Sequence, residues 1–287
     1  MAEKKLRIGL IGVGGICGYV HYPGLDRISG VEIAGLCDPN ADLLAKRQQE
    51  WEIDHCYQDS AAFFREVKPE AVVIATPNIE HKPLILQALA AGCHVICEKP
   101  MAPSLAECQA MIDAAHANNV VLAVAHCMEW GSPLVKAREL LEQNAIGTII
   151  SASISASYPT GQNSSGWRQT DSSDEGGGIL YDMGSHAVDG ITRLLGPIAQ
   201  VAAWADKRTH NFNTEDTASI LAGRVDCARG ILEHMRQTEP AVYTACMRGL
   251  ATSPKVWAMF ALLKLGGKQT ANAPSAAWQN LTWKKMN

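Results

Sequence analysis

Several patterns that define common classes of protein are missing from this 287-residue chain. Its nine cysteines contain no C-x-x-C pair and mostly interrupt apolar segments, which is typical of reduced thiols that are buried as small hydrophobes. There is no H-x-x-x-H motif and no Cys/His cluster, so we expect no metal site. The lysines and arginines are scattered and the net charge is −4, so we expect no nucleic-acid partner.

Long apolar runs are also missing. No run approaches the length of a membrane span, and the N-terminal segment is charged and leads into a strand pattern instead of a signal peptide. We therefore predict a cytoplasmic protein with no membrane partner. The length predicts roughly two domains with a sizeable core.

A glycine-rich loop follows the first apolar run, Leu6 to Ile11, and precedes a helical pattern. It is a G-x-G-x-x-G fingerprint in which Cys17 replaces the third glycine. Gly12 would make the tight turn, Gly14 would let a pyrophosphate reach the backbone, and a small residue at position 17 allows close packing of helix and strand. From this loop we expect the cofactor to contact Gly12, Gly14, Gly15 and Ile16.

An acidic residue lies where a dinucleotide-binding fold needs one. The second predicted strand, Val31 to Cys37, ends at Asp38, about 20 residues beyond the fingerprint, where a carboxylate bonds the ribose hydroxyls. No arginine or serine immediately follows Asp38, so a 2′-phosphate would meet an anion there. The sequence therefore favours NAD over NADP as the cofactor.

Strands and helices continue to alternate, with further strands predicted over 71–75, 93–97 and 120–124. Such alternation predicts a parallel sheet, and ligands bind at the carboxyl ends of its strands. Lys99 precedes a proline, which favours an extended backbone, so its side chain should project from this edge. The predicted cofactor residues at the strand ends are Asp38, Thr76, Pro77, Asn78, Glu98 and Lys99.

The stretch from Gly178 to Asp189 is the main candidate for a reaction site. In a helix, Asp182, His186 and Asp189 would share one face, which would place a carboxylate beside an imidazole. A surface helix with an Asp–His pair is the alternative interpretation.

These motifs together resemble the glucose–fructose oxidoreductase / inositol 2-dehydrogenase / rhizopine catabolism family, called Gfo/Idh/MocA. The resemblance rests on the glycine loop, Thr76-Pro77-Asn78 with His81, Glu98-Lys99-Pro100 and the D-x-x-x-H pair, and covers about residues 5–233. It implies that Lys99, Asp182 and His186 form the reaction centre and bind substrate, and it adds His81 to the cofactor site. It also implies that Trp167 and Arg168 line the substrate pocket; packing of this pair on the sheet is the alternative.

The family fold implied is α/β: an N-terminal Rossmann domain (1–125) and a C-terminal α/β domain (126–287) with an open, mostly antiparallel sheet. Strands are predicted over 148–158, 198–205, 217–222 and 228–233. Many family members form dimers or tetramers through this sheet, so we expect a homodimer or homotetramer. From about His234 the sequence departs from the family, and we expect 235–287 to be truncated, divergent or frame-altered.

The function that the resemblance implies is NAD(P)-dependent hydride transfer between a sugar, cyclitol or related polyol and nicotinamide. His186 is the best general base because its side chain titrates near neutrality, while Lys99 would polarise the reacting oxygen or share the proton transfer. The sequence leaves the choice of primary base open. Two alternatives also remain: an NAD-dependent glycosidase of the same fold, and a non-catalytic NAD-dependent sugar sensor.

Overall fold

The structure is a computed structural model that describes residues 4–147, 149, 152–155, 176–198, 200–209 and 213–223. The chain divides into two compact units. The first contains residues 1–139, 154–194 and 205–218, and the second contains 140–153, 195–204 and 219–287. The predicted domain boundary between 125 and 126 stays a prediction.

The first unit contains a six-stranded parallel sheet in the order β3-β2-β1-β4-β5-β6. This order reverses direction between β1 and β4, the point at which α/β sheets of this kind bind dinucleotides. The predicted Rossmann fold is therefore confirmed. The strands are β1 (Leu6–Ile11), β2 (Val31–Cys37), β3 (Cys56–Tyr57), β4 (Ala71–Ile74), β5 (His94–Cys97) and β6 (Leu122–Val124).

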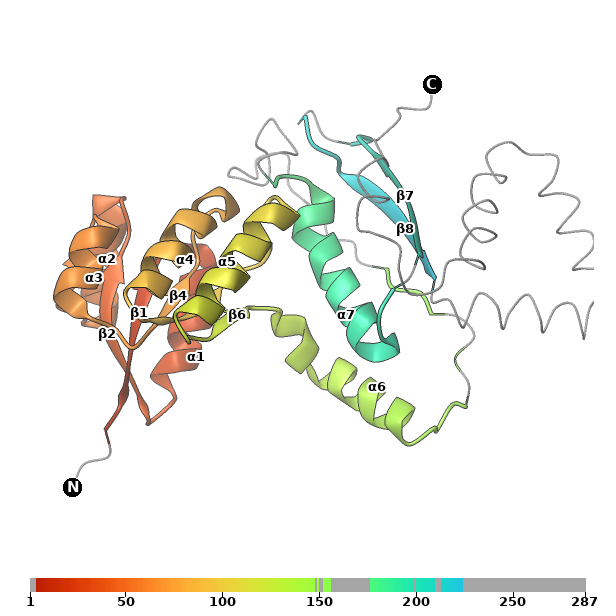
Figure 1. The fold of residues 1–287 in the computed structure, drawn as a ribbon, viewed down its shortest axis with the longest axis horizontal. Helices are drawn as coiled ribbons and strands as arrows, with labels where there is room; N and C mark the ends of the chain where they lie inside the picture. Colours follow the sequence, from red (N-terminus) through yellow and green to blue (C-terminus); the bar gives the residue numbers. More distant parts are fainter. Residues whose placement is uncertain are drawn as a thin grey trace, which may run out of the picture. The chain divides into compact units, whose positions relative to one another are not determined.

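Helices connect these strands (Figure 1). They are α1 (Tyr22–Asp26), α2 (Ala41–Trp51), α3 (Ser60–Val67), α4 (His81–Ala90) and α5 (Leu105–Ala117), with short helical turns at Cys17–His21 (π-helical), Asn78–Glu80 and Cys127–Trp130. The side chains of Asn40, Asp59 and Ser104 accept N–H groups in the first turns of α2, α3 and α5, which explains where these helices begin.

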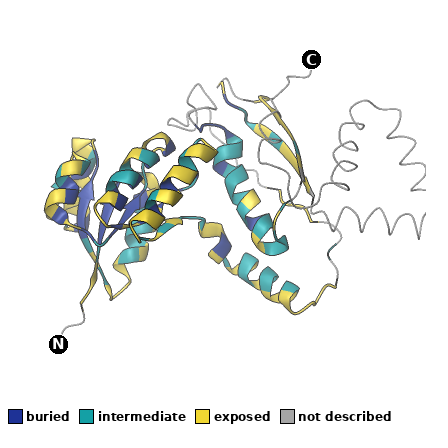
Figure 2. Cartoon of the chain, viewed as in Figure 1, coloured by how far each residue is buried: buried dark blue, intermediate teal, exposed yellow. Residues whose placement is uncertain are grey.

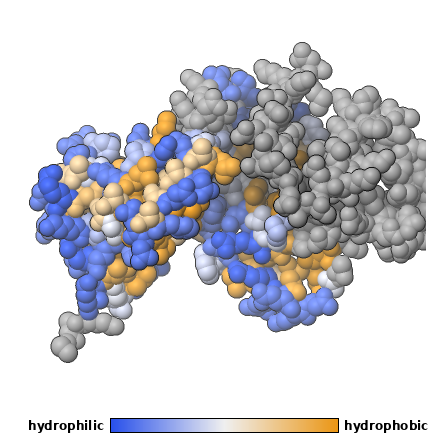
Figure 3. All heavy atoms as spheres, viewed as in Figure 1, coloured by the Kyte–Doolittle hydropathy of each residue, from blue (hydrophilic) through white to orange (hydrophobic). Residues whose placement is uncertain are grey.

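The strands form the buried centre of this unit, and the helices bury one face each (Figure 2). Phe63 of α3 and Leu10 of β1 are fully buried, and the cysteines at 17, 37, 93 and 97 are buried among them as small hydrophobes. Figure 3 shows that hydrophilic side chains predominate over the outer surface of α2 and α3. Among the described residues, no helix is long and apolar enough to cross a membrane.

The later part of the chain contains α6 (Ser132–Glu142), a π-helical turn (Leu180–Gly184) that continues into α7 (Ser185–Leu195), and a two-stranded antiparallel sheet. Its strands, β7 (Gln200–Asp206) and β8 (Thr217–Gly223), correspond to two of the predicted strands. The strand predicted over 148–158 is not found at residues 149 and 152–155, and its other residues lie outside the described part. The predicted strand 228–233 and the atypical segment 235–287 also lie outside it.

Candidate active site

The glycine loop has the geometry that a dinucleotide requires. Gly12 has a φ of +81°, and a Cβ there would lie 2.8 Å from the backbone carbonyl of Ala75, so no other residue fits this turn without strain. At Gly14, by contrast, a Cβ would meet no protein atom within 4 Å. The turn at Gly12 is tight while Gly14 leaves the backbone open to approach. Cys17 is fully buried against the sheet, as its small size allows.

Asp38 is held against this loop at the end of β2. Its Oδ2 accepts the N–H of Val13 at 2.9 Å, and its Oδ1 accepts the N–H of Asn40 at the same distance. The nearby Arg47 donates to the carbonyl of Val13 and pairs with Glu50, so its guanidinium already has partners. This arrangement fits an adenosine ribose with free hydroxyls better than one that carries a phosphate.

The turn after β4 contains two buried polar atoms with no hydrogen-bond partner among the described residues, Oγ1 of Thr76 and Oδ1 of Asn78. The amide nitrogen of Asn78 donates to the carbonyl of Gly176 at 3.0 Å. Buried polar groups are nearly always paired, so these two oxygens are candidates for ligand contacts. Pro77 lies between them in the chain.

His81 is only 1% exposed and lies between two loops of the site. Its Nε2 is 3.0 Å from the carbonyl oxygen of Thr76, and its Nδ1 is 3.0 Å from that of Pro100. At this depth the ring supports the turn after β4 and the loop after β5. Its predicted contact with a cofactor stays a prediction, and any effect of His81 on binding would pass through these loops.

Glu98 joins the glycine-loop helix to the end of β5. Its Oε1 pairs with Nε2 of His21 at 2.7 Å, and its Oε2 accepts the N–H of Lys99 at 3.1 Å. Burial acts to raise the pKa of the Glu98 carboxyl, but the contacts with His21 and Lys99 together lower it below its ordinary value. No sequence pattern around His21 predicts this pairing.

Lys99 contacts the helix that carries Asp182, although the two residues are far apart in the sequence. Its ammonium donates to the carboxylate Oδ1 of Asp182 at 2.6 Å and to the backbone carbonyl of the same residue at 2.8 Å. The two side chains are 10% and 6% exposed, so the ion pair is largely removed from water. The structure thus brings together two of the three predicted catalytic residues.

Two glycines and several cross-links position the helix that carries Asp182. Gly176 and Gly178 both have positive φ, and a side chain at either would collide with Asn78 or Glu215 respectively. The hydroxyl of Tyr181 donates to the carbonyl of Pro103 at 2.8 Å. The chain therefore enters the helix in close contact with the two loops that belong to the candidate cofactor site.

His186 lies one turn beyond Asp182, as predicted, although the intervening turn is π-helical. Burial, then the charges of Lys99 and His126, lower the pKa of His186, while Asp182 and Glu98 act to raise it. The imidazole is therefore favoured in its uncharged form near neutral pH, which is the form that can accept a proton.

His126 is a residue that the sequence interpretation missed. Its ring lies edge to face with that of His186, with the ring centres 6.3 Å apart. Nearby, Glu129 is 7% exposed and pairs with Arg193 of α7, which also pairs with Asp189. The available sequence signal was the position of His126 two residues beyond β6, the same offset that Lys99 has beyond β5.

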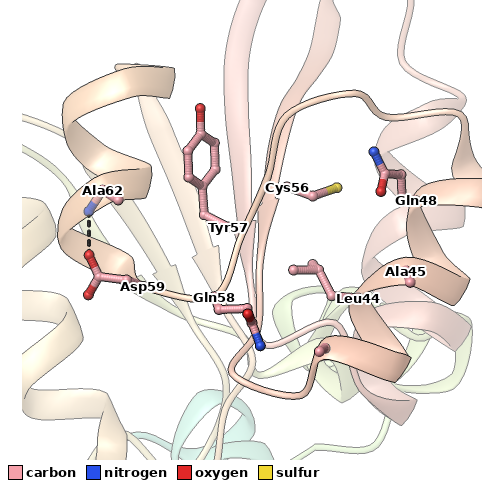
Figure 4. A pocket seen from close by; sticks show the side chains of 9 residues that line it. Leu44, Ala45, Gln48, Cys56, Tyr57, Gln58, Asp59 and Ala62 are labelled. Carbon is pink, nitrogen blue, oxygen red and sulfur yellow. Dashed lines mark hydrogen bonds between the residues drawn. The ribbon is translucent and has the colours of Figure 1, made fainter.

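The other site predictions fall elsewhere or remain untested. Trp167 and Arg168 lie outside the described residues. A shallow hollow of about 430 Å³ opens between α2, β3 and α3 (Figure 4), but it contains none of the predicted site residues. Its carboxylate, Asp59, is used to cap α3 through the N–H of Ala62. Within the described ranges, no group of three or more metal-ligating side chains occurs.

Family models match most of the chain. Residues 6–126 match the Gfo/Idh/MocA model described as "Oxidoreductase family, NAD-binding Rossmann fold". Residues 134–244 match the model described as "GFO/IDH/MocA C-terminal domain".

Three individual proteins, two from sequence and one from structure comparison, are similar to this chain. The D-glucoside 3-dehydrogenase of Escherichia coli is 29% identical over 197 residues, which cover 68% of this chain and 56% of that protein. The D-apiose dehydrogenase of Paraburkholderia graminis is 29% identical over 76% of this chain and 57% of its own length. Among solved structures, an Agrobacterium radiobacter oxidoreductase in complex with NAD+, L-tartaric acid and magnesium is 26% identical, with a TM-score of 0.64 over 76% of this chain and 63% of that one. The chain thus spans under two thirds of the length of each of these proteins.

Proposed function

Because the chain belongs to the Gfo/Idh/MocA oxidoreductase family, with an NAD-binding Rossmann domain, we propose that it is a dehydrogenase or reductase that acts on a CH–OH group. The substrate would be a sugar, cyclitol or related polyol. The names of two relatives, a glucoside dehydrogenase and an apiose dehydrogenase, support this substrate class. The observation that carries the proposal is the buried contact between Lys99 and Asp182, one turn from His186.

The chemistry divides between the cofactor and the protein. NAD, when bound, supplies the carbon that accepts or returns the hydride. The loop residues Gly12, Gly14, Gly15 and Ile16 and the carboxylate of Asp38 would hold it, together with the turns at 76–78 and 98–99. The open backbone at Gly14 and the unpartnered oxygens of Thr76 and Asn78 support this assignment.

The protein itself must move one proton. Oxidation of an alcohol requires its hydroxyl proton to leave, and an uncharged imidazole near the reacting oxygen can accept it. His186 would accept that proton, because its lowered pKa keeps the ring neutral near pH 7. Lys99 would donate a hydrogen bond to the same oxygen and stabilise its negative charge, and Asp182 would fix the direction of the Lys99 side chain.

The test is a panel of cyclitols, aldoses and sugar derivatives mixed with NAD and the purified chain, followed through the absorbance of reduced nicotinamide. We expect at least one polyol to reduce NAD, and we expect Lys99→Met to lower turnover about 100-fold or more while NAD still binds. Cleavage of glycosides without net reduction of NAD would instead indicate the glycosidase. Binding of NAD and sugar with no turnover at all would indicate a sensor.

We further propose that the protein is cytoplasmic and forms a homodimer or homotetramer. The seven described cysteines, all free thiols, support a reducing compartment. The match of residues 134–244 to the family's C-terminal domain supports self-association. Light scattering on the purified chain tests the second point, and a monomer at micromolar concentration would contradict it.

A further inference from the structure

The two histidines 126 and 186 come from separate elements that meet beside the proposed reaction centre. Strands β5 and β6 pair with Cys97 opposite Val124, and the N–H of Ala125 donates to the carbonyl of Cys97 at 2.7 Å. The chain therefore leaves both strands at the same edge of the sheet. Lys99 follows one strand by two residues, and His126 follows the other by two.

The surroundings of the His186 ring disfavour its protonation. The rings lie edge to face at 6.3 Å and 81°, and both Nδ1 atoms are buried with no hydrogen-bond partner among the described residues. A neutral imidazole carries one N–H, whereas an imidazolium carries two, and each N–H needs an acceptor. Protonation of His186 would therefore leave a buried donor with no acceptor among the described residues.

The local charges act in the same direction. Burial is the largest cause of the lowered pKa of His186, and the positive charge of Lys99 lowers this pKa further. Acidic groups partly oppose this effect. However, the carboxylates of Asp182, Glu129 and Asp189 already have cationic partners. The ionisable groups around the pair are Glu98 and Lys99 after β5, Glu129 after β6, Arg138 of α6, and Asp182, Asp189 and Arg193 on the helix that carries His186.

The pair is also held in place. Glu129 lies three residues beyond His126, and its carboxylate pairs with Arg193 of α7. The N–H of Glu129 donates to the carbonyl of His126 at 3.3 Å. The Glu129–Arg193 ion pair thus links the turn that carries His126 to the helix that carries His186, and this link helps to hold the two rings in contact.

We propose that His126 is a positioning residue that acts through His186: its ring packs against the His186 imidazole and keeps that imidazole in place and uncharged, so that His186 is free to accept the substrate's proton. This inference rests on the proposed function for its purpose, but its physical content, a ring contact that disfavours protonation of His186, does not. His126 touches neither substrate nor cofactor in this scheme. Its effect is on the protonation of its neighbour.

The experiment is an NMR titration of the histidine Cε1–H resonances of the full chain without substrate. His126→Asn and His186→Asn each remove one resonance and so identify it, and His116→Asn, in an exposed position on α5, is the matched control. In His126→Asn, the midpoint of the His186 resonance should rise by roughly half a pH unit, because the ring packed against His186 is lost.

His116→Asn should not move the His186 midpoint. An unchanged midpoint of His186 in His126→Asn would overturn the proposal. If that variant does not fold, His126→Gln is measured in the same way, and an unchanged His186 midpoint there would overturn it equally. Failure of every polyol to reduce NAD would contradict the proposed function and leave the effect of His126 on His186 standing.

Discussion

The buried pair formed by Lys99 and Asp182 allows a prediction that separates stability from catalysis. The ammonium and the carboxylate are 2.6 Å apart and almost fully removed from water. Each charge was taken out of water at a cost that its partner offsets. Removal of one member therefore leaves the other buried without the opposite charge of this pair, whereas removal of both removes the two charges together.

The magnitudes follow from this asymmetry. Lys99→Met should lower the free energy of unfolding by about 3 kcal/mol or more, because the Asp182 carboxylate loses its cation. Asp182→Leu should cost somewhat less, since the Lys99 ammonium keeps its bond to the backbone carbonyl of residue 182. The double variant should lie within about 1 kcal/mol of the wild type, since apolar replacement of a buried pair is often neutral.

The assay is urea denaturation followed by tryptophan fluorescence, with the denaturant dependence checked for a constant slope across the four proteins. Lys136→Met provides the control, because the Lys136–Glu139 pair is largely exposed and its loss should change the unfolding free energy by less than about 1 kcal/mol. A double variant that loses the sum of the two single losses would refute the reasoning. Such a result would mean that each side chain stabilises the fold independently of the other.

Three further predictions concern the cofactor site and the core. Gly12→Ala should lower the free energy of unfolding by about 1–3 kcal/mol, because a Cβ at this positive φ would collide with the Ala75 carbonyl. Gly14→Ala should leave the free energy of unfolding unchanged and weaken NAD binding about tenfold. Equal effects of the two variants on both measurements would contradict this. Asp38→Ala should weaken NAD binding at least about tenfold in a fluorescence titration, and the variant should favour NAD over NADP by a smaller affinity ratio than the wild type does. An unaltered ratio would argue against the ribose contact. Phe63→Ala should cost about 3–5 kcal/mol of unfolding free energy, since the ring is fully buried, and a loss below about 1 kcal/mol would contradict that packing.

Local patterns predicted five of the six strands of the parallel sheet, all but β3. The strands Leu6–Ile11 and Val31–Cys37 have the predicted bounds, because an apolar run that ends in a glycine loop or an acid leaves little ambiguity. Strand β4 ends one residue earlier than predicted, where the chain enters a loop of the site, while β5 and β6 end as predicted but begin one and two residues later. The meeting of Lys99 with Asp182 followed from motif resemblance and could not have been obtained from periodicity.

The parts that sequence reasoning missed depend on tertiary geometry. The turn Leu180–Gly184 is π-helical, and a template with 3.6 residues per turn contains no information about such an insertion. His21 and His126 are isolated histidines with no spacing pattern around them. Their partners, Glu98 and His186, become neighbours only once strand order and helix placement are known.

The proposed cofactor site and the proposed acid–base site share structural supports. Asn78, in the turn after β4, donates to Gly176, which leads into the helix of Asp182 and His186. Lys99, in the loop after β5, bonds the same helix. The loops that would hold a dinucleotide are therefore the loops that position the proton-transfer groups. Under the proposed function, a shift of either loop would move the acid–base groups with it. The polar contacts at residues 78 and 99 would then affect catalytic geometry as well as binding.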